Sequence, residues 1–204
     1  NKNILMVQKI MVPPYFGPIS CWKQIINSNI LWDVHQNYIK QTYRNRTFIH
    51  SANGLQILTV PVKHSKIKFS MLEAKIDNSI AWQKNHWRSI ESAYSSSPFF
   101  EFYKDSLEKI YIKEYIYLTK FNFDLIKLIL EWTDIEMKSE LSKDYKIGYE
   151  NSLDLRKNME NKKYSCSENL KYRQVFSDKN GFLNDLSIID LIFNEGPNSI
   201  SYLK

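Results

Sequence analysis

The sequence predicts an α/β fold in a single domain of residues 1–204, with a central mixed, mostly parallel sheet, a β-hairpin extension and a helical C-terminal half. Three observations predict it. Two apolar segments, residues 4–12 and 30–34, flank a helical pattern, and a strand–helix–strand order favours parallel pairing. An Asn-Gly pair at residues 53–54 is typical of a hairpin turn. From residue 79 onward, apolar residues recur at helical spacing.

The strand-rich half, residues 1–78, begins with the predicted strand 4–12. The loop Pro13–Pro18 follows, where three prolines fix the backbone and Gly17 allows a conformation that a side chain forbids. Residues 19–28 are predicted to form a helix with one apolar face, followed by a strand over residues 30–34. We expect the loop 13–18 to lie at the carboxyl end of the first strand and to face residues 35–46, where ligands of open α/β sheets bind.

The predicted hairpin has strands over residues 42–49 and 55–62, joined by the turn at residues 51–54. Threonine, valine, isoleucine and phenylalanine in both segments suit strands, and Pro61 is expected at an edge or a strand end. A further short strand is predicted over residues 72–76.

The helical half, residues 79–135, is predicted to hold three helices, over residues 80–95, 98–111 and 114–133. Residues 142–170 are polar, and we predict a long excursion or mobile lid there. The last part, residues 171–204, is predicted to return as a strand over 172–176. It then forms a terminal helix, with Ser187 and Asp190 as a capping box and Gly196-Pro197 at its end.

Charge and composition limit the classes of binding partner that we expect. The net charge is +6 and the pI about 9.1, which favours an anionic small-molecule partner. The 28 Lys and Arg residues are scattered without a long basic block, which disfavours nucleic acid. The apolar run near the N-terminus is short and broken, so we expect no membrane span and a cytoplasmic protein.

Known catalytic motifs are not evident. Cys21 and Cys166 fit no metal spacing, so we expect two free, buried thiols. Only 5 glycines occur, which argues against phosphate-binding loops and dinucleotide fingerprints. His35, His50 and His64 lie apart from one another and from His86, so we expect neither a metal nor a cofactor.

The first candidate site lies on the predicted helix 80–95. At 100° per residue, His86 shares a broad, mostly apolar face with Trp82 and Trp87. Two interpretations stay open. His86 is either a buried structural residue with both ring nitrogens satisfied, or a general acid or base in a cleft walled by the two tryptophans.

The second candidate site is the segment His35–Arg46. If residues 42–49 form a strand, Arg44 and Arg46 lie on one face of it. With Lys40 they form a plausible anion cradle, because guanidinium groups match phosphate and carboxylate geometry. The alternative is an exposed basic strand paired with scattered acids. Tyr38 and Tyr43 favour the wall of a ligand site.

These segments carry a family resemblance. The sequence resembles the WbqC-like family in five segments, which occur along the chain in the same order as in the family. They are the Pro13–Pro18 loop, Asn37–Arg46, Thr59–Val62, Trp82–Tyr94 and the ending Leu186–Pro197. Many members carry a His-Gln-Pro run at the end of the first strand, whereas this chain reads Met11-Val12-Pro13 there. A catalytic histidine at that place would therefore be missing here.

The resemblance implies a role in the assembly of O-antigen and other surface polysaccharides, with amino-acid or acyl transfer to sugar as a suggested reaction. The expected function is a transferase acting on a nucleotide-sugar or a similar anionic precursor. The alternative is a non-catalytic ligand- or protein-binding module. A deep pocket lined jointly by residues 13–18, 35–46 and 82–94 favours the enzyme, and a shallow aromatic surface favours the module.

The residues expected to act in catalysis are His86 and His35. The residues expected to bind the anionic group are Tyr15, Tyr38, Lys40, Tyr43, Arg44, Asn45, Arg46, Trp82, Trp87 and Arg88.

Overall fold

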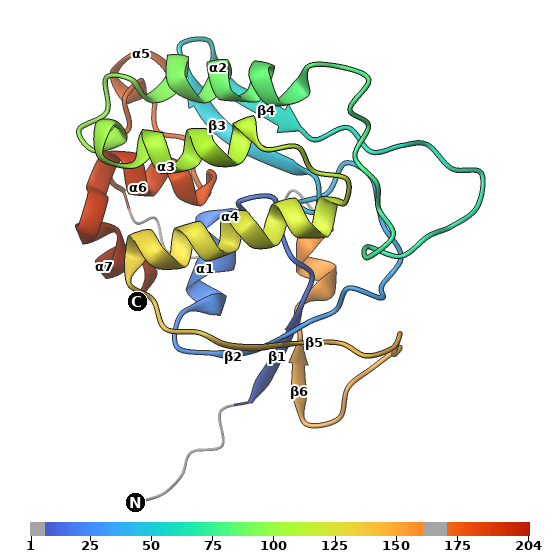
Figure 1. The fold of residues 1–204 in the computed structure, drawn as a ribbon. Coiled ribbons are helices and arrows are strands. Elements are labelled where there is room, and N and C mark those ends of the chain that lie inside the picture. Colours follow the sequence, from blue (N-terminus) through green and yellow to red (C-terminus); the bar gives the residue numbers. More distant parts are fainter. Residues whose placement is uncertain (1–6, 161–170) are drawn as a thin grey trace, which may run out of the picture.

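The computed structural model describes residues 7–160 and 171–204, and it contains a four-stranded sheet, which lies below the hairpin and the helices in the view of Figure 1. The order of its strands is β5-β2-β1-β6, and every neighbouring pair is parallel. The strands are β1 (Gln8–Met11), β2 (Asn29–Trp32), β5 (Lys138–Leu141) and β6 (Ser152–Asp154). The predicted α/β fold is confirmed, and antiparallel pairing occurs in a separate hairpin and in isolated bridges outside the four-stranded sheet.

The strand order reverses direction at β1. Helix α1 (Ile19–Ile25) carries the chain from β1 to β2, and β5 extends the sheet further on that side. The last strand, β6, returns to the other side of β1. Because all four strands are parallel, their carboxyl ends meet at one edge of the sheet. In open α/β sheets, this edge is where ligands bind, next to the strand at which the order reverses.

The hairpin consists of β3 (Arg46–Ser51) and β4 (Gly54–Thr59), which confirms the predicted Asn-Gly turn. Gly54 has a φ of +91°, which a residue with a side chain rarely adopts. The predicted strand from residue 42 is wrong in its first part. Residues 42–45 form a turn, closed by hydrogen bonds from the backbone N–H groups of Asn45 and Arg46 to the carbonyl of Thr42.

Three helices follow, in the predicted order: α2 (Trp82–Tyr94), α3 (Phe100–Ile112) and α4 (Leu118–Thr133). Helix α4 begins four residues later than predicted, because residues 113–117 run as an extended connection. The carbonyl of Ile116 accepts the N–H of Ile76, and Lys75 bridges Tyr117. The predicted strand 72–76 is therefore reduced to isolated bridges.

The last part of the chain is helical. It holds α5 (Ser177–Asn180), α6 (Ile188–Glu195), the 3₁₀ turn η2 (Gly196–Asn198) and α7 (Ser199–Leu203). The predicted strand 172–176 is wrong, because the side chain of Gln174 holds this segment by bonding both the N–H and the carbonyl of Leu183. Helix α6 starts after Ser187 as predicted, but the capping box is wrong, since Asp190 accepts hydrogen bonds from Tyr94 and Tyr172 instead.

The polar stretch from residue 142 is not the simple excursion that was predicted. Within residues 142–160 it contains strand β6 and the 3₁₀ helix η1 (Arg156–Met159), and it is joined to the sheet by pairing with β1. Residues 161–170, where the rest of the predicted lid and Cys166 fall, lie outside the described residues.

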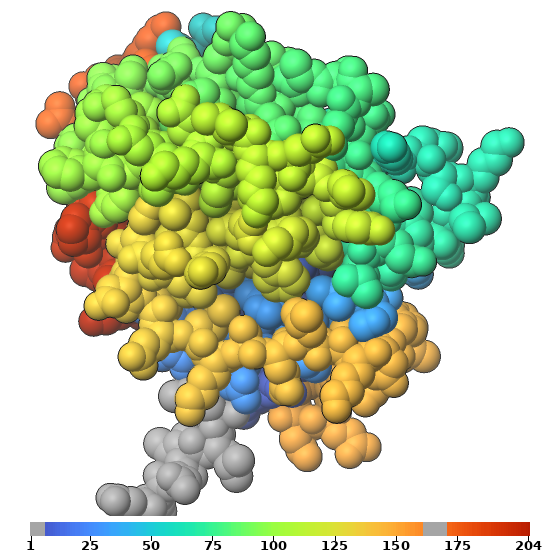
Figure 2. All heavy atoms as spheres, viewed as in Figure 1, coloured from blue at the N-terminus to red at the C-terminus, as the bar shows by residue number. Residues whose placement is uncertain are grey.

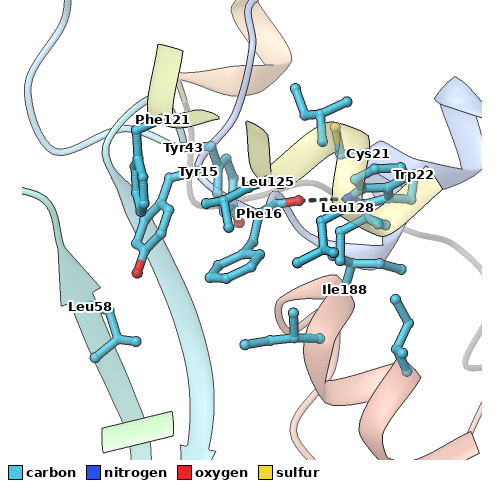
Figure 3. Packing of buried hydrophobic residues seen from close by; sticks show 14 of the residues in the cluster. Tyr15, Phe16, Cys21, Trp22, Tyr43, Leu58, Phe121, Leu125, Leu128 and Ile188 are labelled. Atoms are coloured by element: carbon cyan, nitrogen blue, oxygen red, sulfur yellow. Dashed lines mark hydrogen bonds between the residues drawn. The ribbon is translucent and has the colours of Figure 1, made fainter. Parts of the chain in front are cut away.

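The core lies between the sheet, the hairpin and the helices. Tyr15 and Phe16 from the proline-rich loop are fully buried in it, together with Trp22 of α1 and Phe121 of α4 (Figure 3). The indole N–H of Trp22 donates to the carbonyl of Phe16 at 2.6 Å, which fixes the loop onto α1. The loop after β1 is thus an inner part of the fold and a rigid boundary for whatever lies beside it.

Candidate functional site

Polar and charged side chains gather at the carboxyl ends of the strands. We call this set the carboxyl-edge cluster. Its members are Asp33, His35, Gln36, Arg44, Ser142, Arg156 and Glu160. The cluster receives residues from the ends of β2, β5 and β6 and from the turn before β3, so it collects side chains from segments far apart in the sequence.

Asp33 is the centre of the cluster and is fully buried. Its backbone N–H bonds the carbonyl of Met11, so it directly follows the pairing of β2 with β1. One carboxylate oxygen accepts the backbone N–H groups of His35 and Gln36, both at 3.1 Å, and turns the chain back over the sheet. The other oxygen accepts a 2.7 Å hydrogen bond from Arg156.

Arg156 fastens the end of β6 to the sheet. Its guanidinium donates to both oxygens of Asp154, to Asp33 and to the carbonyls of Lys146 and Ile147. Burial acts to raise the pKa of Asp154, but the hydrogen bonds from Arg156 outweigh it and hold that pKa below its usual value. Since all five guanidinium donors are engaged, Arg156 has a structural role.

His35 lies between the ends of β2 and β5 and is half-buried. Its Nδ1 is 2.9 Å from the hydroxyl of Ser142, the residue that follows β5. Ser142 also lies within 3.3 Å of Asp33 and accepts the backbone N–H of Val34 at 3.2 Å. The predicted candidate His35 is therefore held at the sheet edge by a buried serine and a buried aspartate.

Arg44 was predicted to share a strand face with Arg46, and this prediction is wrong, because Arg44 lies in the turn before β3. Its side chain is 0% exposed and donates to Gln36 at 2.6 Å and to Glu160 at 3.3 Å. Its Nε has no hydrogen-bond partner among the described residues. Burial lowers the pKa of Arg44, while Glu160 acts in the opposite direction.

Tyr38 and Arg46 lie beside Arg44. The ring of Tyr38 stacks on Phe69, with centroids 5.4 Å apart. Burial raises the pKa of Tyr38, and the charges of both arginines act against this rise. Arg46 is half-buried and donates to the hydroxyl of Thr59 at 3.3 Å. Two predicted cations and one predicted aromatic residue are thus brought together.

The expected neighbourhood of the proline-rich loop is confirmed. The backbone N–H of Tyr15 bonds the carbonyl of Tyr43 at 2.8 Å, which joins the loop 13–18 to the segment 35–46. A further loop, residues 63–68, is exposed and projects from the surface (Figure 2, teal). It leads into Phe69, so it stands at the rim of the cluster.

Other predicted site residues are placed in the core. The imidazole of His86 is buried, with Nδ1 2.9 Å from the hydroxyl of Tyr15 and a second hydrogen bond to the backbone of Thr59. The Tyr15 hydroxyl also lies 2.6 Å from that of Tyr111. Burial lowers the pKa of His86 to about 4, so its ring is neutral at pH 7. With both ring nitrogens satisfied, this geometry is the structural alternative for His86.

The remaining predicted residues divide into buried and exposed ones. Tyr43 packs edge-on against Phe48, and the side-chain amide of Asn45 donates to the carbonyl of Val60, so both shape the base of the hairpin. Lys40 and Arg88 are exposed and form no hydrogen bond or ion pair with the described residues. Tyr43 and Asn45 are thus held within the fold, whereas Lys40 and Arg88 lie on its surface.

A pocket joining residues 13–18, 35–46 and 82–94 was expected, but the hollow that residues of α2 line includes no residue of 13–18 or 35–46. A groove of about 510 Å³ lies instead between α2 and α3. Its aromatic lining is Trp82, Trp87 and Tyr111, with polar side chains such as Lys84 and Glu108 at its rim. Two predicted tryptophans therefore belong to a groove that the carboxyl-edge cluster does not share.

Sequence reasoning predicted two members of the cluster, His35 and Arg44, and missed the other five: Asp33, Gln36, Ser142, Arg156 and Glu160. One signal was available for Asp33, which directly follows the apolar run Ile30–Trp32 and so lies at a carboxyl strand end. Ser142 follows a strand whose residues are all exposed, and no apolar pattern marks it. Among the described residues, no group of His, Cys, Asp and Glu side chains is arranged to hold a metal ion.

Comparison of the sequence with known protein families identifies the chain's family. A model of the WbqC-like protein family matches residues 13–169. The chain belongs to the WbqC-like family. The match includes every residue of the carboxyl-edge cluster, so the cluster belongs to the part of this WbqC-like protein that the family shares.

This WbqC-like chain is also similar to the uncharacterized protein Rv1507c of Mycobacterium tuberculosis. The two are 28% identical over an alignment of 239 positions, which covers 100% of this chain and 98% of the relative. No solved structure matches the chain significantly. In the described residues of this WbqC-like protein, no helix is both long and apolar enough to cross a membrane.

Proposed function

We propose that this WbqC-like protein is a group transferase that binds a nucleotide-sugar, or a similar anionic precursor of a surface polysaccharide, at the carboxyl-edge cluster. The observation that carries the proposal is the buried guanidinium of Arg44. Its Nε lacks a partner among the described residues, and its ion pair with Glu160 is long, at 3.3 Å. A buried cation is costly until its donors are paired. A phosphate or carboxylate supplies the missing acceptors.

Three further features support this location. It lies at the carboxyl edge of a parallel sheet, beside the strand where the order reverses. Arg46 adds a second cation, and the Tyr38 ring offers an apolar face for a base or sugar. The family resemblance adds the biological setting, in which the transferred group is an amino acid or an acyl group.

The first experiment tests anion binding with a panel of UDP-, GDP- and dTDP-sugars. We expect one of them to raise the melting temperature of the wild type by mass action. Arg44→Gln and Arg46→Gln should each reduce the binding free energy of that ligand by about 1.5–3 kcal/mol, the usual contribution of a hydrogen bond to a charged group. Isothermal titration calorimetry measures the loss.

Lys40→Gln is the matched control, because Lys40 is a nearby but exposed cation. It should leave the dissociation constant within about twofold, as expected for a screened surface charge. Equal losses in Lys40→Gln and Arg46→Gln would indicate non-specific attraction and contradict the proposed site. Arg46→Gln keeps the test valid if Arg44→Gln fails to fold.

Glu160 is expected to compete with the ligand. Its carboxylate is 31% exposed and holds Arg44 through a single long contact, which a phosphate making two contacts can replace. Glu160→Gln should therefore tighten binding of the same nucleotide-sugar by about 1 kcal/mol, roughly fivefold. Glu150→Gln removes an exposed charge before the amino end of β6, outside the carboxyl-edge cluster, and should have no effect. Weaker binding in Glu160→Gln would show that Glu160 contacts the ligand favourably.

The alternative is a non-catalytic binding module, and the groove between α2 and α3 favours it. The exposed surface of the groove is mostly apolar, and its lining includes Trp82, Trp87 and the exposed Ile80 and Ile112. If Trp87→Ala abolishes ligand binding while Arg44→Gln and Arg46→Gln do not, the ligand binds in this groove and the binding-module function replaces the transferase.

A further inference from the structure

The hydrogen bonds of the Ser142 hydroxyl bear on which ring nitrogen of His35 carries a proton in the neutral form. This hydroxyl has three neighbours: the backbone N–H of Val34 at 3.2 Å, the Asp33 carboxylate at 3.3 Å and Nδ1 of His35 at 2.9 Å. A serine hydroxyl donates one hydrogen bond and accepts two. The N–H of Val34 can only donate, so it occupies one acceptor position of Ser142.

The single hydrogen of Ser142 then goes to the strongest acceptor. The Asp33 carboxylate is an ion, held by Arg156 at 2.7 Å, and an ionised acceptor forms a stronger hydrogen bond than a neutral imidazole. Ser142 therefore donates to Asp33 and accepts from Nδ1 of His35. The proton of the neutral ring resides on Nδ1, which leaves the lone pair on Nε2.

The free nitrogen is accessible. His35 is half-buried, and its Nε2 has no hydrogen-bond partner among the described residues. The next residue, Gln36, binds Arg44, and the charges of Asp33 and Arg44 interact. A histidine with one nitrogen anchored and the other carrying a lone pair beside an anion site has the geometry of a general base.

We propose that His35 is the general base of the transfer reaction and that Ser142 and Asp33 are its positioning residues, an inference that rests on the proposed function. Nε2 takes a proton from an amine or hydroxyl acceptor while the acceptor atom bonds to the electrophilic carbon of the donor. The bond from that carbon to the anionic leaving group breaks, and the leaving group keeps the electron pair. The imidazolium then returns the proton to the leaving group.

The first test needs no substrate. Long-range ¹H–¹⁵N correlation spectra of the ¹⁵N-labelled full chain report which ring nitrogen carries the proton. We expect the Nδ1–H form for His35 in the wild type and in Ser142→Thr, which keeps the hydroxyl. Ser142→Ala should shift the ring toward a mixture of tautomers. A wild-type ring protonated on Nε2 would overturn the inference.

The second test measures nucleophilicity with diethyl pyrocarbonate, whose carbonyl carbon is attacked by a neutral imidazole nitrogen, with loss of carbon dioxide and ethanol. Mass spectrometry compares the four histidines. We expect His35 to react at least as fast as exposed His64 and more than tenfold faster than buried His50 and His86. A His35 rate as slow as that of His86 would overturn the inference.

The third test separates this inference from the proposed function. The nucleotide-sugar that stabilises the wild type should bind His35→Gln within about threefold and should protect His35 from diethyl pyrocarbonate. If no nucleotide-sugar binds the wild type, the proposed function fails, whatever the tautomer. If the ligand binds but leaves His35 unprotected, the anion site stands and His35 is not its base.

Discussion

Arg156→Met is expected to lower the free energy of unfolding by about 3–5 kcal/mol, the usual cost of removing one partner from a buried ion pair. Arg156 holds the fully buried Asp33 at 2.7 Å and also fixes the carbonyls of Lys146 and Ile147. The substitution keeps an unbranched side chain but leaves the carboxylate of Asp33 without its cation. Urea unfolding followed by circular dichroism measures the loss.

Lys157→Met is the control, because Lys157 is the adjacent, exposed cation of the same 3₁₀ helix. It should change the stability by no more than about 0.5 kcal/mol. Adding Asp33→Asn to Arg156→Met should restore part of the stability, since the unpaired charge is then gone. A double variant less stable than either single one would mean that the Asp33 charge is not the cause.

The second large effect is on the pH dependence of stability, where His86 and Asp190 act in opposite directions. Burial lowers the pKa of His86 from 6.5 to about 4. Between these pH values, His86 is protonated in the unfolded chain and neutral in the folded chain. Stability therefore falls as the pH falls through this window. Burial raises the pKa of Asp190 from 3.8 to about 6, despite hydrogen bonds from Tyr172 and Tyr94, so here stability rises as the pH falls. Each of the two groups changes the free energy of unfolding by on the order of 3 kcal/mol across its pH window.

His86→Gln should therefore lose less stability than the wild type between pH 7 and pH 4, and Asp190→Asn should lose more. Urea unfolding at both pH values gives the two differences, which must have opposite signs. His50, whose pKa burial also lowers, is present in both variants and does not affect their comparison. If both variants changed in the same direction, one of the two buried groups would not carry the assigned charge.

The parts of the fold that local patterns determine were predictable. Helix α1 and β2 follow from apolar patterns, and the hairpin follows from Asn53-Gly54. The first strand was predicted over residues 4–12; β1 occupies Gln8–Met11, and residues 4–6 lie outside the described residues. Helix α2 was predicted within two residues at either end, since its apolar face repeats at helical spacing. These elements need no information from distant residues.

The outer strands were not predictable, because pairing with distant residues creates them. All four residues of β5 are exposed, and β6 has only three residues, so neither shows the alternation of a half-buried strand. Ser142 and Glu160 follow these outer elements, so no sequence pattern marked them as site residues. Arg44 was assigned to a strand because the residues around it favour β-structure. It lies instead in a turn that is fixed by hydrogen bonds to the carbonyl of Thr42.

The pairing of β6 with β1 also bears on how the protein forms at the ribosome. Strand β1 emerges before the other described strands, and β2 covers one of its edges soon afterwards. Its other edge pairs with Ser152–Asp154, which emerge only after the whole helical half has been made. An unpaired strand edge is a template for wrong pairing with other chains. Incomplete chains ending before residue 152 are therefore expected to aggregate, and the nascent protein depends on protection of the β1 edge until its last strand arrives.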